Sequence, residues 1–360
     1  MRVRVYPADT YGCGHFRLIW ASQELQKQGA DIELVDPGER QLELRRDGEN
    51  IIGVNFGDDR PDVIVLQRVS HRFLAQAVPL IRAQGIAVVI DIDDDLTSIH
   101  PSNPAYAALH PRNEYSRRND RGEPGRHSWH HLTTACREAT LVTCSTPALA
   151  ARYAAHGRGK VIYNYLPGFY YDVSHEDSDL LGWPAAIASH PDDPSATGGA
   201  VARLLSEGVR FHCVGDPAGV AGAFGAPQAK ITGIGGVNVY DWPKEVTKLG
   251  VGVAPLADTR FNAAKSWLKP LEMSALGIPW VASPRVEYDR LARRGAGVTA
   301  GRSRVWYREL RRLLDSAELR AEMAGRGREV ADGLRLDGHA GEWWDAWAHA
   351  HDLQRGLVPA

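Results

Sequence analysis

Short apolar runs alternate with longer stretches of mixed character along the first half of the chain. The runs have the length of buried strands, and the stretches between them are long enough for helices. We therefore expect strands over residues 2–6, 31–35, 63–67, 87–90 and 141–145. Helices are expected over residues 16–28, 73–84 and 129–139. This alternation predicts an α/β fold with a parallel, doubly wound sheet.

The second half repeats the pattern after an aromatic and polar stretch that runs from residue 164 to residue 179. Strands are expected over residues 185–188, 211–214, 230–232, 251–255 and 279–283, and helices near 195–206 and over 304–324. Because each half has its own strands and helices, we predict two Rossmann-like domains. Their predicted bounds are residues 1–166 and 167–337, followed by a C-terminal helical segment over 338–360.

Composition limits the class of protein. The 360 residues are 44% hydrophobic and 24% charged, which is typical of a globular protein long enough for two cores. The net charge of −2 gives no global reason to expect binding to nucleic acid or to an anionic membrane. No signal-peptide pattern or membrane-spanning apolar run is found. We therefore expect a cytoplasmic location and no stable membrane insertion. The four scattered cysteines favour neither a zinc site nor a disulfide framework.

The most informative stretch covers residues 250–283, where two predicted strands flank a loop and a short helix. The loop and helix start read K-S-W-L-K-P-L-E, with Lys265, Ser266, Lys269 and Glu272. Proline suits the start of a helix and glycine the position after its end, so the helix is expected to begin at Pro270 and to end before Gly277. Backbone N–H groups and two lysines near a helix N-terminus favour phosphate binding.

This stretch resembles the donor half-site of retaining glycosyltransferases with the GT-B fold, close to glycosyltransferase family 4, in a subgroup with the motif K-S-x-x-K-x-x-E. The resemblance implies that Lys265, Ser266 and Lys269 hold the diphosphate of a nucleotide sugar. It also implies that Glu272 holds the ribose hydroxyls. Ala264 stands where the family carries an acidic residue that touches the sugar.

Two further loops gain meaning from the resemblance. The first predicted strand is followed by Y-G-C-G-H-F-R, and the family has a glycine-bearing loop there that faces the donor, so Gly12, Gly14 and Arg17 are candidates for donor binding. In the second domain a loop frames the nucleotide base, and Tyr240 is the candidate contact. The terminal helix of GT-B proteins crosses back to the first domain, so the tryptophans of the C-terminal segment are expected to pack there.

An acidic run follows the predicted strand 87–90. Three consecutive carboxylates need a compensating partner, which can be solvent, a cation, helix N–H groups or substrate. We favour polar contacts of Asp93 and Asp94 with the reacting sugars, and His100 lies close enough in sequence to join them. No essential metal and no cofactor beyond the donor are expected. The arginine-rich loop from Arg112 to Arg126 is either a solvated surface loop or a clasp for an anionic acceptor.

The sequence therefore indicates a glycosyltransferase that moves a sugar from a nucleoside-diphosphate sugar to an acceptor hydroxyl, with retention. The resemblance leaves the acceptor open among glycan, lipid, protein and modified nucleic acid, and such enzymes also occur in bacteriophage genomes. One alternative is a sugar-nucleotide or glycan-binding protein without turnover. Another is a nicotinamide-dependent oxidoreductase, in which Asp36 would hold the ribose. The dinucleotide-binding motif of such enzymes is G-x-G-x-x-G, and here Arg17 stands in place of its third glycine.

Overall fold

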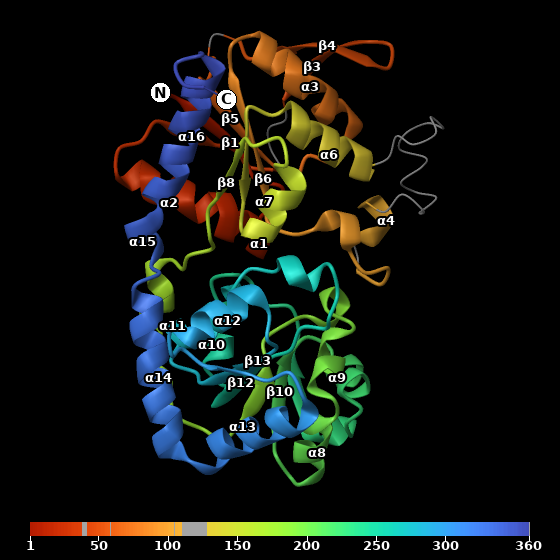
Figure 1. The fold of residues 1–360 in the computed structure, drawn as a ribbon, viewed down its shortest axis with the longest axis vertical. Coiled ribbons are helices and arrows are strands. Elements are labelled where there is room, and N and C mark those ends of the chain that lie inside the picture. The colour runs from red at the N-terminus through yellow and green to blue at the C-terminus, as the bar shows by residue number, and fades with distance from the viewer. Residues whose placement is uncertain (38–41, 58, 104, 110–127, 360) are drawn as a thin grey trace. The chain divides into compact units, whose positions relative to one another are not determined.

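The computed structural model describes residues 1–360 apart from 38–41, 58, 104, 110–127 and 360. The chain divides into two compact units. The first is formed by Met1–Pro101, Ala105–Asn164 and His339–Ala360, and the second chiefly by Tyr165–Gly338. Each unit contains a six-stranded parallel sheet covered by helices, as Figure 1 shows. Two Rossmann-like units are the predicted architecture, and that prediction is confirmed.

The first sheet has the strand order β2-β1-β5-β6-β7-β8. Its strands are β1 (Val3–Tyr6), β2 (Ile32–Leu34), β5 (Val63–Gln67), β6 (Ala87–Ile92), β7 (Leu141–Cys144) and β8 (Gly159–Val161). Every residue of β5, β6 and β7 is buried, as expected for strands with helices on both faces. The order reverses between β1 and β5, which makes the carboxyl ends of these two strands the topological switch point, where open α/β sheets bind ligands.

Helices cover both faces of this sheet, with α2 and α16 on one side and α3 and α6 on the other (Figure 1). Their bounds are α1 (Gly12–Gly14), the π-helical turn η1 (His15–Ile19), α2 (Trp20–Lys27), α3 (Arg72–Ala83), η2 (Leu96–Ser98), α4 (Tyr106–Leu109), α6 (Ser128–Glu138), α7 (Pro147–Tyr153) and α16 (Gly341–Gln354). A hairpin of β3 (Glu43–Asp47) and β4 (Asn50–Asn55), which the sequence pattern missed, packs on α3.

The C-terminal helix α16 returns to the first unit, as predicted, and contacts β5, β6 and α2. Trp343 and Trp347 are fully buried there. The same sequence segment therefore closes the core of a unit whose other elements lie at the opposite end of the chain.

The second sheet has the order β11-β10-β9-β12-β13-β14, and its switch point lies between β9 and β12. The strands are β9 (Leu181–Trp183), β10 (Phe211–Val214), β11 (Ile231–Ile234), β12 (Val251–Ala254), β13 (Trp280–Ala282) and β14 (Val298–Thr299). The helices are α8 (Ala200–Ser206), α9 (Pro217–Phe224), α10 (Trp242–Val246), α11 (Leu268–Ala275), α12 (Val286–Arg293), α13 (Ser303–Asp315), α14 (Ala317–Asp332) and α15 (Leu336–His339). Five 3₁₀ turns complete it: η3 (Gly168–Tyr170), η4 (Ile187–Ser189), η5 (Asp193–Thr197), η6 (Gln228–Lys230) and η7 (Asn262–Ala264).

The predicted strand over residues 185–188 was wrong. The strand is β9, and residues 187–189 form the turn η4 instead. Leu181 and Trp183 belong to the core of the unit, whereas Pro184, which has no N–H for a ladder bond, follows the last strand residue. The apolar run that the sequence pattern selected lies just beyond that proline.

Two predicted helices are each divided by a local signal. The helix expected near 195–206 is split by Gly198 and Gly199, whose φ angles of 57° and 82° are left-handed. The helix expected over 304–324 becomes α13 and α14, because Ser316 has extended backbone and its side chain accepts a bond from the Leu319 N–H at 3.1 Å. Among the described residues, no helix is both long and apolar enough to cross a membrane.

Candidate functional site

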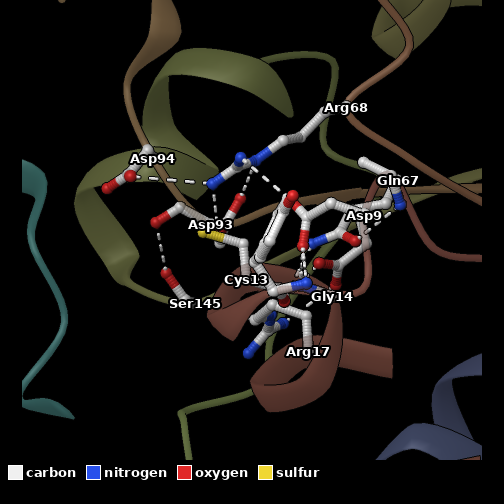
Figure 2. A network of polar contacts seen from close by, with 12 residues as sticks. Asp9, Cys13, Gly14, Arg17, Gln67, Arg68, Asp93, Asp94 and Ser145 are labelled. Carbon is white, nitrogen blue, oxygen red and sulfur yellow. Dashed lines mark hydrogen bonds and ion pairs between the residues drawn. The ribbon is translucent and has the colours of Figure 1, made fainter. Parts of the chain in front are cut away.

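The switch point of the first sheet carries a cluster of one arginine and three carboxylates. Asp9 follows β1, Arg68 follows β5, and Asp93 and Asp94 follow β6. Figure 2 shows the Arg68 guanidinium reaching Asp93, with Asp94 and Asp9 on either side. The compensating partner that the acidic run requires is therefore an arginine from the neighbouring strand end.

Arg68 binds Asp93 through two parallel hydrogen bonds of 2.5 Å and lies 3.6 Å from Asp94 and 3.9 Å from Asp9. Burial alone would raise the pKa of Asp93, but the adjacent Arg68 holds that pKa below its ordinary value. Arg68 has a φ of 53°, so the chain turns sharply as it leaves β5, a conformation that costs energy for any residue with a side chain. Strained residues of this kind concentrate at functional sites.

We expect Arg68→Gln to destabilise the protein by about 3 kcal/mol at pH 7, because Asp93 would keep a buried charge without its partner. The folded-state pKa of Asp93 is depressed, so the ion pair contributes stability above the ordinary aspartate pKa of about 3.9 and loses it as the pH falls through the folded-state value. Urea unfolding at several pH values should therefore show a wild-type advantage that shrinks in acid.

The matched control for that experiment is Arg72→Gln, four residues along the same segment. Arg72 pairs at 3.4 Å with Glu49, which is far more exposed than Asp93. Removing Arg72 should therefore lower the free energy of unfolding only slightly. A difference between wild type and Arg68→Gln that stays constant from pH 3 to pH 7 would contradict the assignment of the charge pair.

Arg17, a predicted donor-binding residue, has a different place. It is fully buried, and its guanidinium donates to both oxygens of Asp91 at 3.1 and 2.9 Å. It also donates to the Ile162 carbonyl at 2.6 Å and to the Asn164 side chain at 2.9 Å. A guanidinium with these partners and no exposed surface ties η1 to β6 and to the end of the first unit. The structure gives it a role in holding the fold.

The remaining acid of the run is also internal. Asp95 is fully buried and accepts hydrogen bonds from Tyr153 at 2.9 Å and from Thr97 at 2.7 Å, and it pairs with Arg152. The outer and inner acids of the run therefore serve different purposes: Asp91 and Asp95 hold the fold, whereas Asp93 and Asp94 share Arg68 after β6.

The glycines of the first loop lie in a helical turn, α1, with ordinary negative φ. A Cβ on Gly14 would lie 1.9 Å from the Asp9 carbonyl oxygen, whereas a Cβ on Gly12 would meet only the Phe16 ring at 3.9 Å. The Gly14 N–H donates to the Asp9 carboxylate at 3.0 Å. Gly14 is thus needed for close packing of the loop that carries Asp9, and Gly12 leaves open surface beside it.

His100 lies just after η2 and is half-buried. The arginine-rich loop from Arg112 to Arg126 falls outside the described residues.

A second polar site lies at the switch point of the second sheet. A small pocket there is lined by residues from the ends of β9 and β12, and from α11 and α12. Its polar members are His190, Asp193, Lys269 and Tyr288. The pocket lies where a ligand of an open α/β sheet is expected, and one of the predicted phosphate-binding lysines faces it.

Asp193 fixes the loop that leaves β12. It is buried and accepts hydrogen bonds from the Ala257 N–H at 2.9 Å and from the Asn262 amide at 2.5 Å. Its other oxygen is 2.7 Å from Nδ1 of His190. Asp193 therefore connects the loop after β9 to the loop that leads to Lys265, and so gives the pocket a defined shape.

Glu272 is a second buried acid, with 2% of its side chain exposed, and it reaches the pocket through its partner Lys269. One oxygen, Oε1, accepts a hydrogen bond from the Tyr170 hydroxyl at 2.7 Å, and Oε2 lies 3.1 Å from Nζ of Lys269. Lys269 also lies over the Trp242 ring, 4.2 Å from its centroid. Two predicted donor-binding residues thus make direct contact.

Tyr240 joins the same group through aromatic rings. Its ring is half exposed, and its centroid lies 5.7 Å from that of the Phe169 ring. The Phe169 centroid in turn lies 5.1 Å from that of Tyr170. Lys265 lies in the loop before α11, with Nζ 4.4 Å from the Phe261 ring, and Ser266 follows it. The structure therefore brings Tyr240, Lys269 and Glu272 together. The contacts that connect them run through Phe169 and Tyr170, two residues that the sequence did not indicate.

Helix α11 begins at Leu268, two residues before the predicted start, and Gly277 follows its end with a φ of 72°. Pro270 is accordingly in the third helical position, where its missing N–H still costs no intrahelical bond. Glu272 then lies one turn in from the N-terminus. Lys269 precedes it by three residues, which is the spacing that lets the two side chains meet.

No family model matches the sequence, and neither does any curated protein sequence. Solved structures do match. A glycosyltransferase from Rickettsia africae ESF-5 has a TM-score of 0.63 at 10% identity, covering 97% of both chains. HepE from Anabaena, solved in complex with UDP, has a TM-score of 0.59 at 13% identity, covering 97% of this chain and 100% of that chain. WaaG, a glycosyltransferase involved in lipopolysaccharide biosynthesis, has a TM-score of 0.59 at 13% identity, with 96% and 99% covered.

These similarities extend over almost the whole of each chain. They show that the protein has the fold of these glycosyltransferases, with both Rossmann-like units present. At 10–13% identity these similarities show the shared fold and not the roles of individual side chains.

Proposed function

We propose that the protein is a glycosyltransferase that moves a sugar from a nucleoside-diphosphate sugar to an acceptor hydroxyl. The observation that carries the proposal is the Glu272 cluster: a buried carboxylate held by Tyr170 and Lys269, beside a pocket at a sheet switch point. A buried carboxylate can accept hydrogen bonds from sugar hydroxyls, and an adjacent lysine can neutralise a phosphate. Together they match the ribose and the diphosphate of a nucleoside diphosphate.

The donor would lie along the second unit. Lys269 and Lys265 would neutralise the diphosphate, and Ser266, in the loop before α11, would donate a hydrogen bond to it. The helix N-terminus adds favourable charge. Glu272 would hold the ribose, and Tyr240, whose ring is half exposed, would contact the base. That HepE is a UDP complex and shares this fold supports a nucleoside-diphosphate donor.

Asp93, Asp94 and His100 of the first unit would contact the reacting sugars. Arg68 keeps the Asp93 carboxylate ionised and fixed in direction, so it can accept hydrogen bonds without reorganising. We further propose the subgroup of family 4 with the K-S-x-x-K-x-x-E motif, and therefore retention. In that mechanism the departing diphosphate takes the proton of the incoming hydroxyl on the same face, and the protein supplies position and compensating charge.

The experiment that tests the function is turnover of nucleotide sugars. The protein is incubated with UDP-, GDP-, ADP- and dTDP-glucose, with and without Mg²⁺, and release of the nucleoside diphosphate is measured. Release above that of a Glu272→Gln, Lys269→Met double variant supports the transferase. Binding of the nucleotide without any release, even with glycan acceptors added, would favour a binding protein without turnover.

A further inference from the structure

We propose that Tyr170 is a positioning residue that fixes Glu272 and so makes the site select nucleoside diphosphates with an intact ribose. This inference rests on the proposed function. Tyr170 lies outside the K-S-x-x-K-x-x-E motif, and its contact with Glu272 narrows the donor to ribonucleotides.

Tyr170 is held rigidly. Its side chain is fully buried, and it ends the turn η3, which follows Pro167. The segment before it is anchored by a parallel bridge between Leu166 and Arg335, and the Leu336 N–H donates to the Leu166 carbonyl at 2.8 Å. Packing around the ring and the bridge before the turn thus both hold Tyr170 in place.

The Tyr170 hydroxyl can only donate to Glu272. Burial and the neighbouring carboxylate raise the pKa of Tyr170 well above its ordinary value, so the phenol keeps its proton. The bond to Oε1 is 2.7 Å long, as is usual for a hydroxyl bound to a carboxylate. This bond sets the plane of the Glu272 carboxylate before any ligand arrives.

The second partner of Glu272 is of a different kind. Lys269 is 30% exposed, has a flexible stem, lies over Trp242 and faces the switch-point pocket. Because Glu272 is only 2% exposed, an incoming hydroxyl has to displace one of the two donors. The buried phenol cannot move away, whereas the lysine can move to a phosphate, which satisfies its charge equally well.

The exchange leaves Oε1 with its Tyr170 bond and makes Oε2 available to the ligand. Each carboxylate oxygen accepts two hydrogen bonds, so Glu272 can then take both hydroxyls of a ribose. A deoxyribose would leave a buried carboxylate oxygen without a donor after Lys269 has moved, and sites of this kind reject the analogue that lacks the hydroxyl. The arrangement therefore disfavours 2′-deoxy and 3′-deoxy nucleotides, dTDP included.

The test is calorimetric binding of UDP, GDP and ADP, of their 2′-deoxy and 3′-deoxy counterparts, and of dTDP. Wild type is compared with Tyr170→Phe and with Tyr171→Phe. Tyr171 is a matched control, because its hydroxyl makes a 2.7 Å bond to the Ala331 carbonyl and its burial likewise raises its pKa. Both variants should fold, since each substitution removes one oxygen atom.

We expect the ribonucleotide that binds wild type to bind at least tenfold more tightly than its deoxy counterparts. Tyr170→Phe should weaken binding of the ribonucleotide about tenfold and leave binding of the deoxy forms almost unchanged. The variant would therefore no longer discriminate between ribose and deoxyribose. Tyr171→Phe should keep this discrimination. Tyr170→Phe with undiminished discrimination, or dTDP bound as tightly as the ribonucleotides, would overturn the inference alone. Absence of binding by every nucleotide would overturn the proposed function as well.

Discussion

Replacing Glu272 with glutamine is expected to weaken nucleoside diphosphate binding by about 10- to 100-fold, the loss of one or two hydrogen bonds to a buried charge. Glutamine keeps the shape of the side chain and can still accept from Tyr170, but it loses the charge that orients the ribose hydroxyls. The measurement is calorimetric titration with the nucleoside diphosphate and, separately, with inorganic pyrophosphate.

Pyrophosphate, which has no ribose, distinguishes the role of Glu272 from that of its neighbour Lys269. Glu272→Gln should leave pyrophosphate binding unchanged or stronger, because it removes a negative charge 3.1 Å from Lys269. Lys269→Met should weaken the binding of both the nucleoside diphosphate and pyrophosphate. The matched controls are Glu245→Gln and Lys248→Met, since these residues form an ion pair with the same three-residue spacing and neither lines the switch-point pocket. Equal losses in the control variants would show that the effect is general electrostatics.

Replacing Arg17 with methionine is expected to destabilise the first unit by about 3–5 kcal/mol, because Asp91 would remain fully buried without its ion-pair partner. Methionine keeps much of the volume of the stem, so the loss reports the charge and its four hydrogen bonds. Urea unfolding followed by circular dichroism measures the loss.

Two comparisons sharpen that result. Arg203→Met removes an arginine from an exposed pair with Glu207 and should cost less than about 1 kcal/mol. In an Arg17→Met, Asp91→Leu double variant, most of the stability should return, since no unpaired charge is left. If Arg17→Met alone lowered the free energy of unfolding only slightly but weakened nucleotide binding, Arg17 would instead be assigned to the donor site.

The sequence pattern was sufficient for the parallel sheets, because buried strands such as β5 and β6 are continuous apolar runs that no other structure explains as well. It failed at the strand β9 and at the β3–β4 hairpin. At β9 the pattern selected residues beyond Pro184, although that proline itself marks the end of the strand. The β3–β4 hairpin was missed because its residues are largely polar and exposed, without an apolar run.

At the candidate site, sequence spacing found the pairs that are close along the chain and missed those that the fold creates. Lys269 and Glu272 meet because they share a helix face. Arg68 and Asp93 meet because their strands are neighbours, and the switch-point rule applied to the predicted strand ends would have indicated this pair. Tyr170 and Glu272 are 102 residues apart, and no local signal connects them.

The most direct test of the central claim is calorimetric titration of the wild-type protein with UDP, GDP, ADP and dTDP, each with and without Mg²⁺. The claim is that the second unit holds a nucleoside diphosphate at Lys269 and Glu272, at the carboxyl ends of β9 and β12. We predict saturable binding of one ribonucleotide with a preference for its base, and similar affinity without the metal. If none of the four binds under either condition, the donor site, and with it the proposed transferase, is contradicted.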